Sequence, residues 1–430
     1  MKPMLDEVKL SQIVFDEVVY PRKDHDPALV QRYAEVLEEI EAKQDFISVA
    51  ADNKLLDGKH LWLAYRKHHD GNADPTIRVF RYDVATPHEQ LKLAASLNSI
   101  HGWQLTDADK QHTAITLHGY GCTYEDIAAT LSVGKKKVGQ WLSRTVKEEK
   151  DRRDQRIFDL WLACRTQEEI AETVGCSREN VKVLVKEFQE TFLPNQLKSH
   201  QAAAEHAADF EPPIYNVWKQ QTKSNKVSHF GNSEVRWLDN LLYLYTKPFD
   251  VVVDPFAGGG STIDVCKKRL RRYWVSDRKP IVEREGEIRQ HDITTGLPPL
   301  PRWKDVRLVY LDPPYWKQAE GQYGDGETNL ANMPLEEFNK VLADLIKGFS
   351  KKLTSAYLAL IIQPTQWNAP ERIFTDHIRD MLRAVDLEVD MRFSVPYESQ
   401  QYNAQMVDWA KANRRCLVLT REIIVWITAS

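Results

Sequence analysis

The chain has 430 residues, of which 58 are Lys or Arg and 62 are Asp or Glu, so its net charge is −4. This length predicts two or three domains with their own cores, and the balanced charge excludes a uniformly polycationic protein. No apolar run is long enough to span a membrane, the first residues lack a signal-peptide core, and the five scattered cysteines include no Cys-x-x-Cys pair. We therefore expect a cytoplasmic protein without a membrane span, a disulfide framework or a metal site.

Residues 1–100 alternate short β-rich runs, such as TIRVFRYDV, with helical patterns such as ALVQRYAEVLEEIEA, which predicts an α+β domain. Within them, KLLDGKHLWLAYRKH resembles the ParB/sulfiredoxin-like domain, where a strand and a glycine turn lead into a basic helix start. That family normally has Gly-x-x-Arg here, with the arginine gripping phosphate. Gly58 is present, but a leucine takes the place of the arginine. The alternatives are an anion site that uses Lys59, His60 and Arg66, and a module that serves structure or DNA docking alone.

Residues 101–195 read as almost wholly helical and contain an internal repeat, with copies at 123–142 and 166–185. Each copy begins Thr-x-Glu, an N-cap with a first-turn acid, and continues through Ile-Ala and a turn into a second helix. This pattern is typical of a helix-turn-helix, whose second helix exposes its first turn. A helical bundle without nucleic acid is the alternative. For DNA binding, the candidate contacts to phosphates and base edges are Lys135, Lys136, Lys137, Gln140, Arg178 and Asn180.

Residues 196–213 are small and polar and end in two prolines, as expected of a linker. Beyond them, residues 214–430 alternate apolar β-rich runs (FDVVVD, YWVSD, RLVYLD, AYLALIIQ) with helical patterns such as PLEEFNKVLADLIKGFS. That alternation predicts a mostly parallel sheet covered by helices. The expected fold class is α/β, with an α+β N-terminal domain and a central all-α region.

Three of the apolar runs end in an acid. FDVVVD ends at Asp254 and leads into three consecutive glycines and a helix start, without the Walker lysine or the Gly-x-Gly-x-x-Gly spacing. RRYWVSD ends at Asp277, and VYLDPPYW carries Asp312. Because ligands bind beyond the carboxyl ends of the strands in open α/β sheets, we expect these three acids to converge on one crevice.

The pairing of DPFAGGGST with LDPPYW resembles the amino-directed, S-adenosylmethionine-dependent DNA methyltransferases, which methylate adenine N6 or cytosine N4. The resemblance implies a Rossmann-like methyltransferase domain, S-adenosyl-L-methionine as cofactor and double-stranded DNA as partner. It also implies that Asp277 holds the cofactor ribose and that Asp292 lies beside the adenine ring. The methionine end of the cofactor would lie at the glycine loop, at Asp254, Phe256, Ala257, Gly258 and Gly259. An Asp before Pro-Pro-Tyr is more often associated with adenine in this family.

The chemistry of Asp-Pro-Pro-Tyr can also be derived from the residues themselves. An exocyclic amine is a poor nucleophile because its lone pair is delocalised into the base ring. The Asp312 carboxylate and the Pro313 carbonyl would accept both amine hydrogens and favour a pyramidal nitrogen. Pro313 and Pro314 fix φ and lack N–H groups, while Tyr315 offers a flat face to a base extracted from the duplex. These four residues are the predicted catalytic set, and the chemistry requires no metal.

The sequence therefore predicts a site-specific DNA methyltransferase with adenine N6 as the preferred target. Alternatives are cytosine N4, RNA or a protein glutamine as the target, and a ParB-like DNA-binding or regulatory protein whose methylase domain is not catalytic. The polar, glycine-rich segment 317–334 is predicted to be a lid over the flipped base, with a plain surface loop as the alternative. A homodimer is compatible with this sequence.

Overall fold

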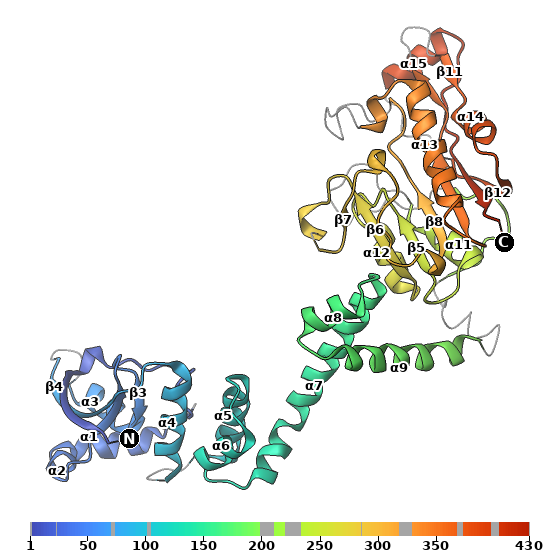
Figure 1. The fold of residues 1–430 in the computed structure, drawn as a ribbon. Helices are drawn as coiled ribbons and strands as arrows, with labels where there is room; N and C mark the ends of the chain where they lie inside the picture. The colour runs from blue at the N-terminus through green and yellow to red at the C-terminus, as the bar shows by residue number, and fades with distance from the viewer. Residues whose placement is uncertain are drawn as a thin grey trace. The chain divides into compact units, whose positions relative to one another are not determined.

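The structure is a computed structural model that describes residues 2–22, 24–69, 74–100, 105–197, 210–219, 234–284, 286–317, 329–367, 373–396 and 404–429. The chain forms two compact units, Met1–Arg152 and Arg153–Ser430 (Figure 1). None of the helices within these ranges is long and apolar enough to cross a membrane.

The first unit is built on a mixed sheet that has, in the described residues, four strands in the order β1-β4-β2-β3. β4 is antiparallel to β1 and parallel to β2, and β2 is antiparallel to β3. In β4, Ile77 and Val79 are buried in the core, as the two-residue period of a strand with one buried face requires. The elements of this α+β part are β1 (Met4–Lys9), α1 (Pro27–Glu35), α2 (Leu37–Ala42), β2 (Ile47–Ala50), β3 (Leu55–Asp57), α3 (Lys59–His68) and β4 (Thr76–Tyr82).

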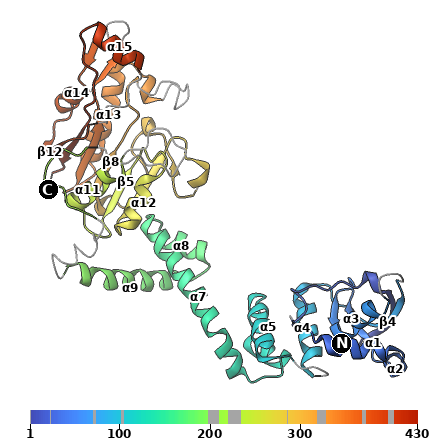
Figure 2. The same cartoon turned by 180° about the vertical axis from the view of Figure 1, so that it is seen from behind.

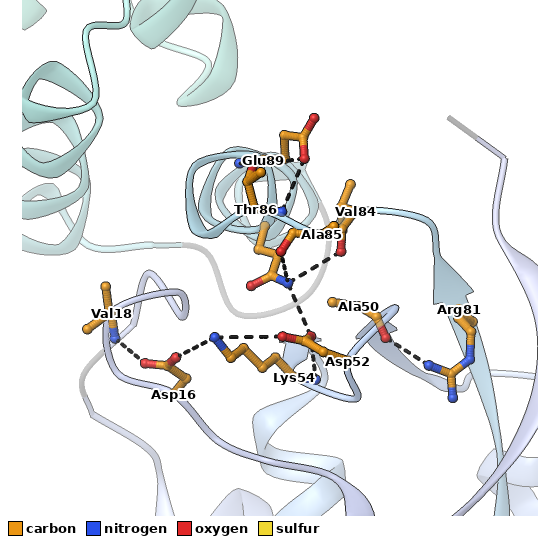
Figure 3. A network of polar contacts seen from close by, with 11 residues as sticks. Asp16, Val18, Ala50, Asp52, Lys54, Arg81, Val84, Ala85, Thr86 and Glu89 are labelled. Carbon is orange, nitrogen blue, oxygen red and sulfur yellow. Dashed lines mark hydrogen bonds and ion pairs between the residues drawn. The ribbon is translucent and has the colours of Figure 1, made fainter.

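A polar network joins this sheet to the helix that follows it (Figure 3). Asp52, in the turn between β2 and β3, accepts a hydrogen bond of 3.1 Å from Nε2 of Gln90, which is buried on α4 (Pro87–Ile100). The Lys54 Nζ lies 3.0 Å from the Asp16 carboxylate and 3.7 Å from that of Asp52. The turn is thereby fixed from both sides, and α4 is held to the sheet edge.

The central region is all-α, as predicted, and each copy of the repeat forms two helices joined by a short turn. Thr123 and Thr166 are the two N-caps, and each side chain accepts a hydrogen bond from the N–H three residues later. We call α6 with the first turns of α7 the first helical pair, and α8 with α9 the second helical pair. The helices are α5 (Asp107–Gly119), α6 (Tyr124–Thr130), α7 (Lys135–Leu162), α8 (Gln167–Val174) and α9 (Arg178–Leu197).

The second unit contains a sheet of seven strands in its described part, in the order β12-β13-β9-β8-β5-β6-β7. β5 to β9 are mutually parallel, whereas β13 is antiparallel to both of its neighbours. The chain proceeds from β5 to β6 and β7 on one side, then returns to β8 and β9 on the other, so a topological switch point lies between β5 and β8. The strands are β5 (Val251–Asp254), β6 (Arg272–Asp277), β7 (Arg289–Gln290), β8 (Val306–Leu311), β9 (Tyr357–Ile362), β12 (Glu388–Ser394) and β13 (Glu422–Ile427).

Helices cover both faces of this sheet (Figures 1 and 2). In β5, Val252 packs in the core with α11 and α12, while Val251 and Val253 pack in the core with α13 and α14. This alternation is the two-residue period of a strand buried on both faces. The remaining elements are α11 (Val235–Tyr245), α12 (Ser261–Lys268), α13 (Leu335–Ser350), β10 (Thr365–Trp367), β11 (Ile373–Thr375), α14 (His377–Ala384) and α15 (Ala404–Ala412), with 3-10 turns at Leu10–Gln12, Val282–Arg284, Ile293–Thr295, Trp303–Asp305 and Leu330–Asn332. The predicted mixed α/β class with a mostly parallel sheet is confirmed.

Candidate active site

The three strand-end acids gather at one edge of the large sheet. Asp254 is the last residue of β5, Asp277 is the last residue of β6, and Asp312 directly follows β8. These strands are neighbours and parallel, so their carboxyl ends face the same side. The charges of Asp312 and Asp277 both reach the Asp254 carboxyl. The expected convergence on one crevice is therefore in agreement with the sheet order.

Asp254 is a buried acid with a strongly shifted pKa. Its side chain is 2% exposed, and its Oδ2 accepts a 2.5 Å hydrogen bond from the Thr262 hydroxyl. Its Oδ1 accepts one of 2.8 Å from the Phe256 N–H. Burial raises the pKa of Asp254 to about 7, helped by the nearby charges of Asp312 and Asp277 and opposed by the two hydrogen bonds. Such a group sets the shape of the glycine loop from within the protein.

The glycine loop is tied directly to the next strand. The Gly258 N–H donates to Asp277 Oδ2 at 2.9 Å, and the Ala257 N–H donates to the Ser276 carbonyl at 2.9 Å. Gly258 has a φ of +49°, in the left-handed region that a glycine adopts without strain. Asp277 Oδ1 also accepts the Lys279 N–H at 2.9 Å. Each carboxylate oxygen has a second lone pair, so Asp277 can still accept from a ligand hydroxyl.

Arg284 packs against the glycine loop, a contact that the sequence did not indicate. Its guanidinium donates to both oxygens of Asp264 on α12, at 2.9 and 2.7 Å. Its side chain runs so close to Gly260 that a Cβ there would lie 2.7 Å from Arg284 Cδ. Gly260 also has a φ of +79° and is the N-cap of α12. The positive φ thus favours glycine at this position, and a Cβ here would require the Arg284 side chain to move.

Asp292 lies two residues beyond β7, on the same edge of the sheet. Its Oδ1 accepts from the Thr294 N–H at 3.0 Å and from the Thr294 hydroxyl at 2.7 Å. It therefore caps the 3-10 turn Ile293–Thr295. This position is compatible with the predicted contact to an adenine ring, which stays a prediction.

The Asp-Pro-Pro-Tyr motif leaves β8 with its acid and its aromatic ring facing each other. The Tyr315 hydroxyl donates to Asp312 Oδ1 at 3.3 Å, and both residues are half-buried. Pro313 is buried, and Pro314 is half-buried. Trp316 is part of the core, with its indole N–H donating to the Met333 carbonyl at 2.9 Å. The motif is therefore anchored at Trp316 and presents Asp312 and Tyr315 at its open end.

Arg421 is a second residue that sequence reasoning missed. It precedes β13, is 3% exposed, and places its guanidinium 4.4 Å from the centre of the Trp237 ring. Its Nη1 lies 3.5 Å from the Tyr315 hydroxyl. Its charge also reaches the buried Tyr310 of β8, two residues before Asp312. No motif surrounds Arg421 in the sequence, because its partners come from other elements.

The residues at this edge fit S-adenosylmethionine in their chemistry. When bound, this cofactor supplies an electrophilic methyl group on a sulfonium. Carboxylates at Asp277 and Asp312 suit its positive charges, and Asp277 suits a vicinal diol. The glycines allow the backbone of the loop to approach a ligand closely. Among the described residues there is no cluster of His, Cys, Asp or Glu that could hold a metal ion.

The candidate DNA-contacting side chains lie at the starts of α7 and α9. Lys135 forms an ion pair with Glu125, and Lys137 forms one of 2.7 Å with Asp107, whereas Lys136 is exposed. Gln140 is exposed on the same helix. In the second helical pair, Arg178 forms an ion pair of 2.9 Å with Glu168, and Asn180 is exposed.

The first unit buries two cations, Lys59 and Arg22, and the neutral imidazole of His60 around the start of α3. Lys59 and His60, at the start of α3, are 6% and 5% exposed, and Arg22 is buried beside them. Burial lowers the pKa of Lys59 and brings that of His60 to about 4, and Arg22 adds to both effects. Arg66 instead stacks its guanidinium on Trp62, 4.9 Å from the ring centre. Most of the predicted lid, residues 318–328, and part of the linker, residues 198–209, lie outside the described residues.

Comparison with known proteins finds one family whose pattern matches part of the chain. Residues 122–281 match the DNA methylase family. The match includes the glycine loop and Asp277 and ends before Asp312. It confirms the methylase resemblance of this sequence. No curated protein matches the chain.

Several solved structures are similar to parts of the chain. A SAM dependent methyltransferase from Archaeoglobus fulgidus has 14% identity and a TM-score of 0.28, over 45% of this chain and 94% of that one. The chromosome-partitioning protein ParB from Caulobacter crescentus, complexed with CTP-gamma-S, has 15% identity and a TM-score of 0.20, over 32% and 77%. The same protein complexed to the centromeric parS site has 12% identity and a TM-score of 0.24, over 42% and 99%.

Proposed function

We propose that this protein transfers a methyl group from S-adenosyl-L-methionine to the exocyclic amine of a base in double-stranded DNA, with adenine N6 as the target. The observation that carries the proposal is the placement of Asp312, beyond β8, beside the acid-lined glycine loop beyond β5. The strands are adjacent, so an amine held at Asp312 lies next to a ligand held at Asp277 and the glycine loop. The match to the DNA methylase family supports DNA as the substrate class.

The protein's own groups act by binding and orientation. Asp312 and the Pro313 carbonyl accept the two amine hydrogens, which turns the nitrogen lone pair towards the methyl donor. The base stacks on Tyr315, whose ring is oriented by the bond from its hydroxyl to Asp312. Cytosine N4 presents the same two hydrogens, so the choice of adenine rests on the Asp that precedes Pro-Pro-Tyr.

The test is a direct product analysis. The purified chain is incubated with S-adenosylmethionine and unmethylated genomic DNA, the DNA is digested, and the nucleosides are separated by mass and retention. We expect N6-methyladenine, and its absence in the Asp312→Ala variant. N4-methylcytosine instead would overturn the choice of base, and no methylated nucleoside would overturn the activity.

A further inference from the structure

The two helical pairs share a sequence pattern but not a charge. The first copy, residues 123–142, has three lysines against two acids, which gives +1. The second copy, residues 166–185, has two basic residues against four acids, which gives −2. DNA binding draws most of its affinity from cations at the phosphates, so the first copy suits a duplex and the second does not.

Cations of both helical pairs form ion pairs with nearby acids, as Lys135 does with Glu125 and Lys137 with Asp107. In the second helical pair, besides the pair of Arg178 with Glu168, the Lys182 Nζ lies 3.4 Å from Glu179, and the Lys186 Nζ lies 3.6 Å from Glu190. The first helical pair differs in that it leads into a stretch of net positive charge. From residue 135 to residue 156, nine basic side chains stand against four acids.

The end of α7 and the second helical pair share a buried core with the large sheet. Phe158 and Trp161, in the last turns of α7, lie with ring centres 6.4 and 5.1 Å from that of Phe249, just before β5. Ile170 of α8 and Val181 of α9 belong to the same buried core as the sheet residues Val252 and Tyr273. This core is continuous, so the second helical pair and the sheet fold as one body.

Three arginines add further contacts between the α7–α8 region and the amino ends of the strands. Arg272, the first residue of β6, places its guanidinium 5.1 Å from the centre of the Trp161 ring. Arg289, the first residue of β7, donates to the Ala163 carbonyl at 2.9 Å. Arg165 donates to the Gly286 carbonyl at 2.9 Å, just ahead of β7. In both views of the fold α8 lies close to α12 (Figures 1 and 2).

The two edges of the sheet are therefore used differently. Asp254, Asp277 and Asp312 lie at the carboxyl ends, whereas the end of α7 and the turn into α8 contact the sheet at its amino ends. A six-residue strand separates these edges by about 20 Å. The base to be methylated would therefore be held at the edge opposite to the contacts of the α7 end and α8 with the sheet.

We propose that the second helical pair docks on the sheet of its own chain and does not contact DNA, so that DNA is bound by the first helical pair. This rests on DNA being the substrate, as proposed above. Repetition supplied two copies of one helical unit, and their charges and packing assign the copies to two different partners.

Charge-matched variants test the DNA half of the proposal. One variant replaces Lys135, Lys136 and Lys137 by Gln, and the other replaces Arg178, Lys182 and Lys186 by Gln. We expect the first to weaken duplex binding at least about ten-fold and to reduce the slope of log affinity against log salt by about 2 to 3. The second is expected to stay within about two-fold of the unchanged protein. Equal weakening by both variants would overturn the proposal.

Hydrogen exchange on the full chain tests the docking half without requiring DNA. We expect the amides of α8 to exchange as slowly as those of β5 and β6, because they open in one cooperative unit. Added duplex is expected to protect the start of α7 and to leave α9 unchanged. Fast exchange throughout α8, or DNA-induced protection of α9, would contradict the proposal. A wild-type chain that binds no duplex would overturn the proposed function, while the exchange of α8 still decides the docking.

Discussion

The amino and carboxyl ends of β8 carry the same residue in opposite settings. At the amino end, Asp305 lies 3.4 Å from the guanidinium of Arg272. Arg272 lies against Trp161, which together with Phe158 and Phe249 forms the aromatic contact that we call the dock. At the carboxyl end, Asp312 shares its surroundings with two further acids. One edge of the sheet neutralises its charges and buries rings, whereas the other concentrates like charge. Carboxylates held close together repel one another, and such clusters of acids are typical of ligand-binding sites.

The largest expected effect comes from a substitution at the amino ends of the strands. Trp161→Ala removes a buried indole that packs at a tilt against Phe249 and lies beneath the Arg272 guanidinium. We expect a loss of about 3–5 kcal/mol in the free energy of unfolding of the second unit, measured by denaturant titration. Methyl transfer per folded molecule should stay unchanged. A variant with full stability would show that the dock contributes nothing to the fold.

The next largest effect is expected from a substitution at the carboxyl ends of the strands. Asp312→Asn keeps the shape and one acceptor oxygen but removes the negative charge that strengthens the hydrogen bond from the amine. We expect the methyl-transfer rate to fall by about 10²-fold, the lower end of what the loss of a whole preorganised hydrogen-bonding group costs. The matched control is Asp305→Asn, the same substitution at the other end of β8. Equal rates for the two variants would refute the role of Asp312.

Most of the carboxyl edge could be predicted from the sequence, and most of the amino edge could not. Asp254, Asp277 and Asp312 each end an apolar run, and the ends of neighbouring parallel strands meet by topology. The dock joins side chains more than a hundred residues apart, such as Trp161 with Arg272, and neither belongs to a local pattern. Arg421 and Arg284 were missed for the same reason, since their partners come from other elements. The charge difference between the repeat copies was visible in the sequence, but its meaning required the packing.

A third prediction sharpens the comparison through pH. The pKa of Asp254 is about 7 in the folded protein against an ordinary value of 3.8, so the folded state holds this proton more tightly. Stability from this group is complete below about pH 4 and is lost as pH rises through 7. Asp254→Asn keeps the acceptor for the Phe256 N–H and should remove this decline. Unfolding titrations from pH 4 to 8 measure it, and a decline equal in both proteins would contradict the assignment.

The smallest effect compares a glycine from each edge. Gly260 and Gly175 both have left-handed φ values, +79° and +71°. A Cβ on Gly175, at the end of α8, meets nothing within 4 Å, whereas one on Gly260 meets the Arg284 side chain. Gly175→Ala should therefore cost only the backbone strain, about 1 kcal/mol of stability, and leave cofactor binding unchanged.

Gly260→Ala carries the same backbone strain and, in addition, pushes Arg284 away from Asp264. Because the displaced side chain disturbs the glycine loop, we expect the Kd for S-adenosylmethionine, measured by calorimetry, to rise by up to about ten-fold, which is equivalent to about 1.4 kcal/mol of binding free energy. Adding Arg284→Ala to Gly260→Ala removes the clash and should restore part of the affinity. If the double variant binds no better than Gly260→Ala alone, the backbone strain accounts for the whole loss, and Arg284 does not shape the loop.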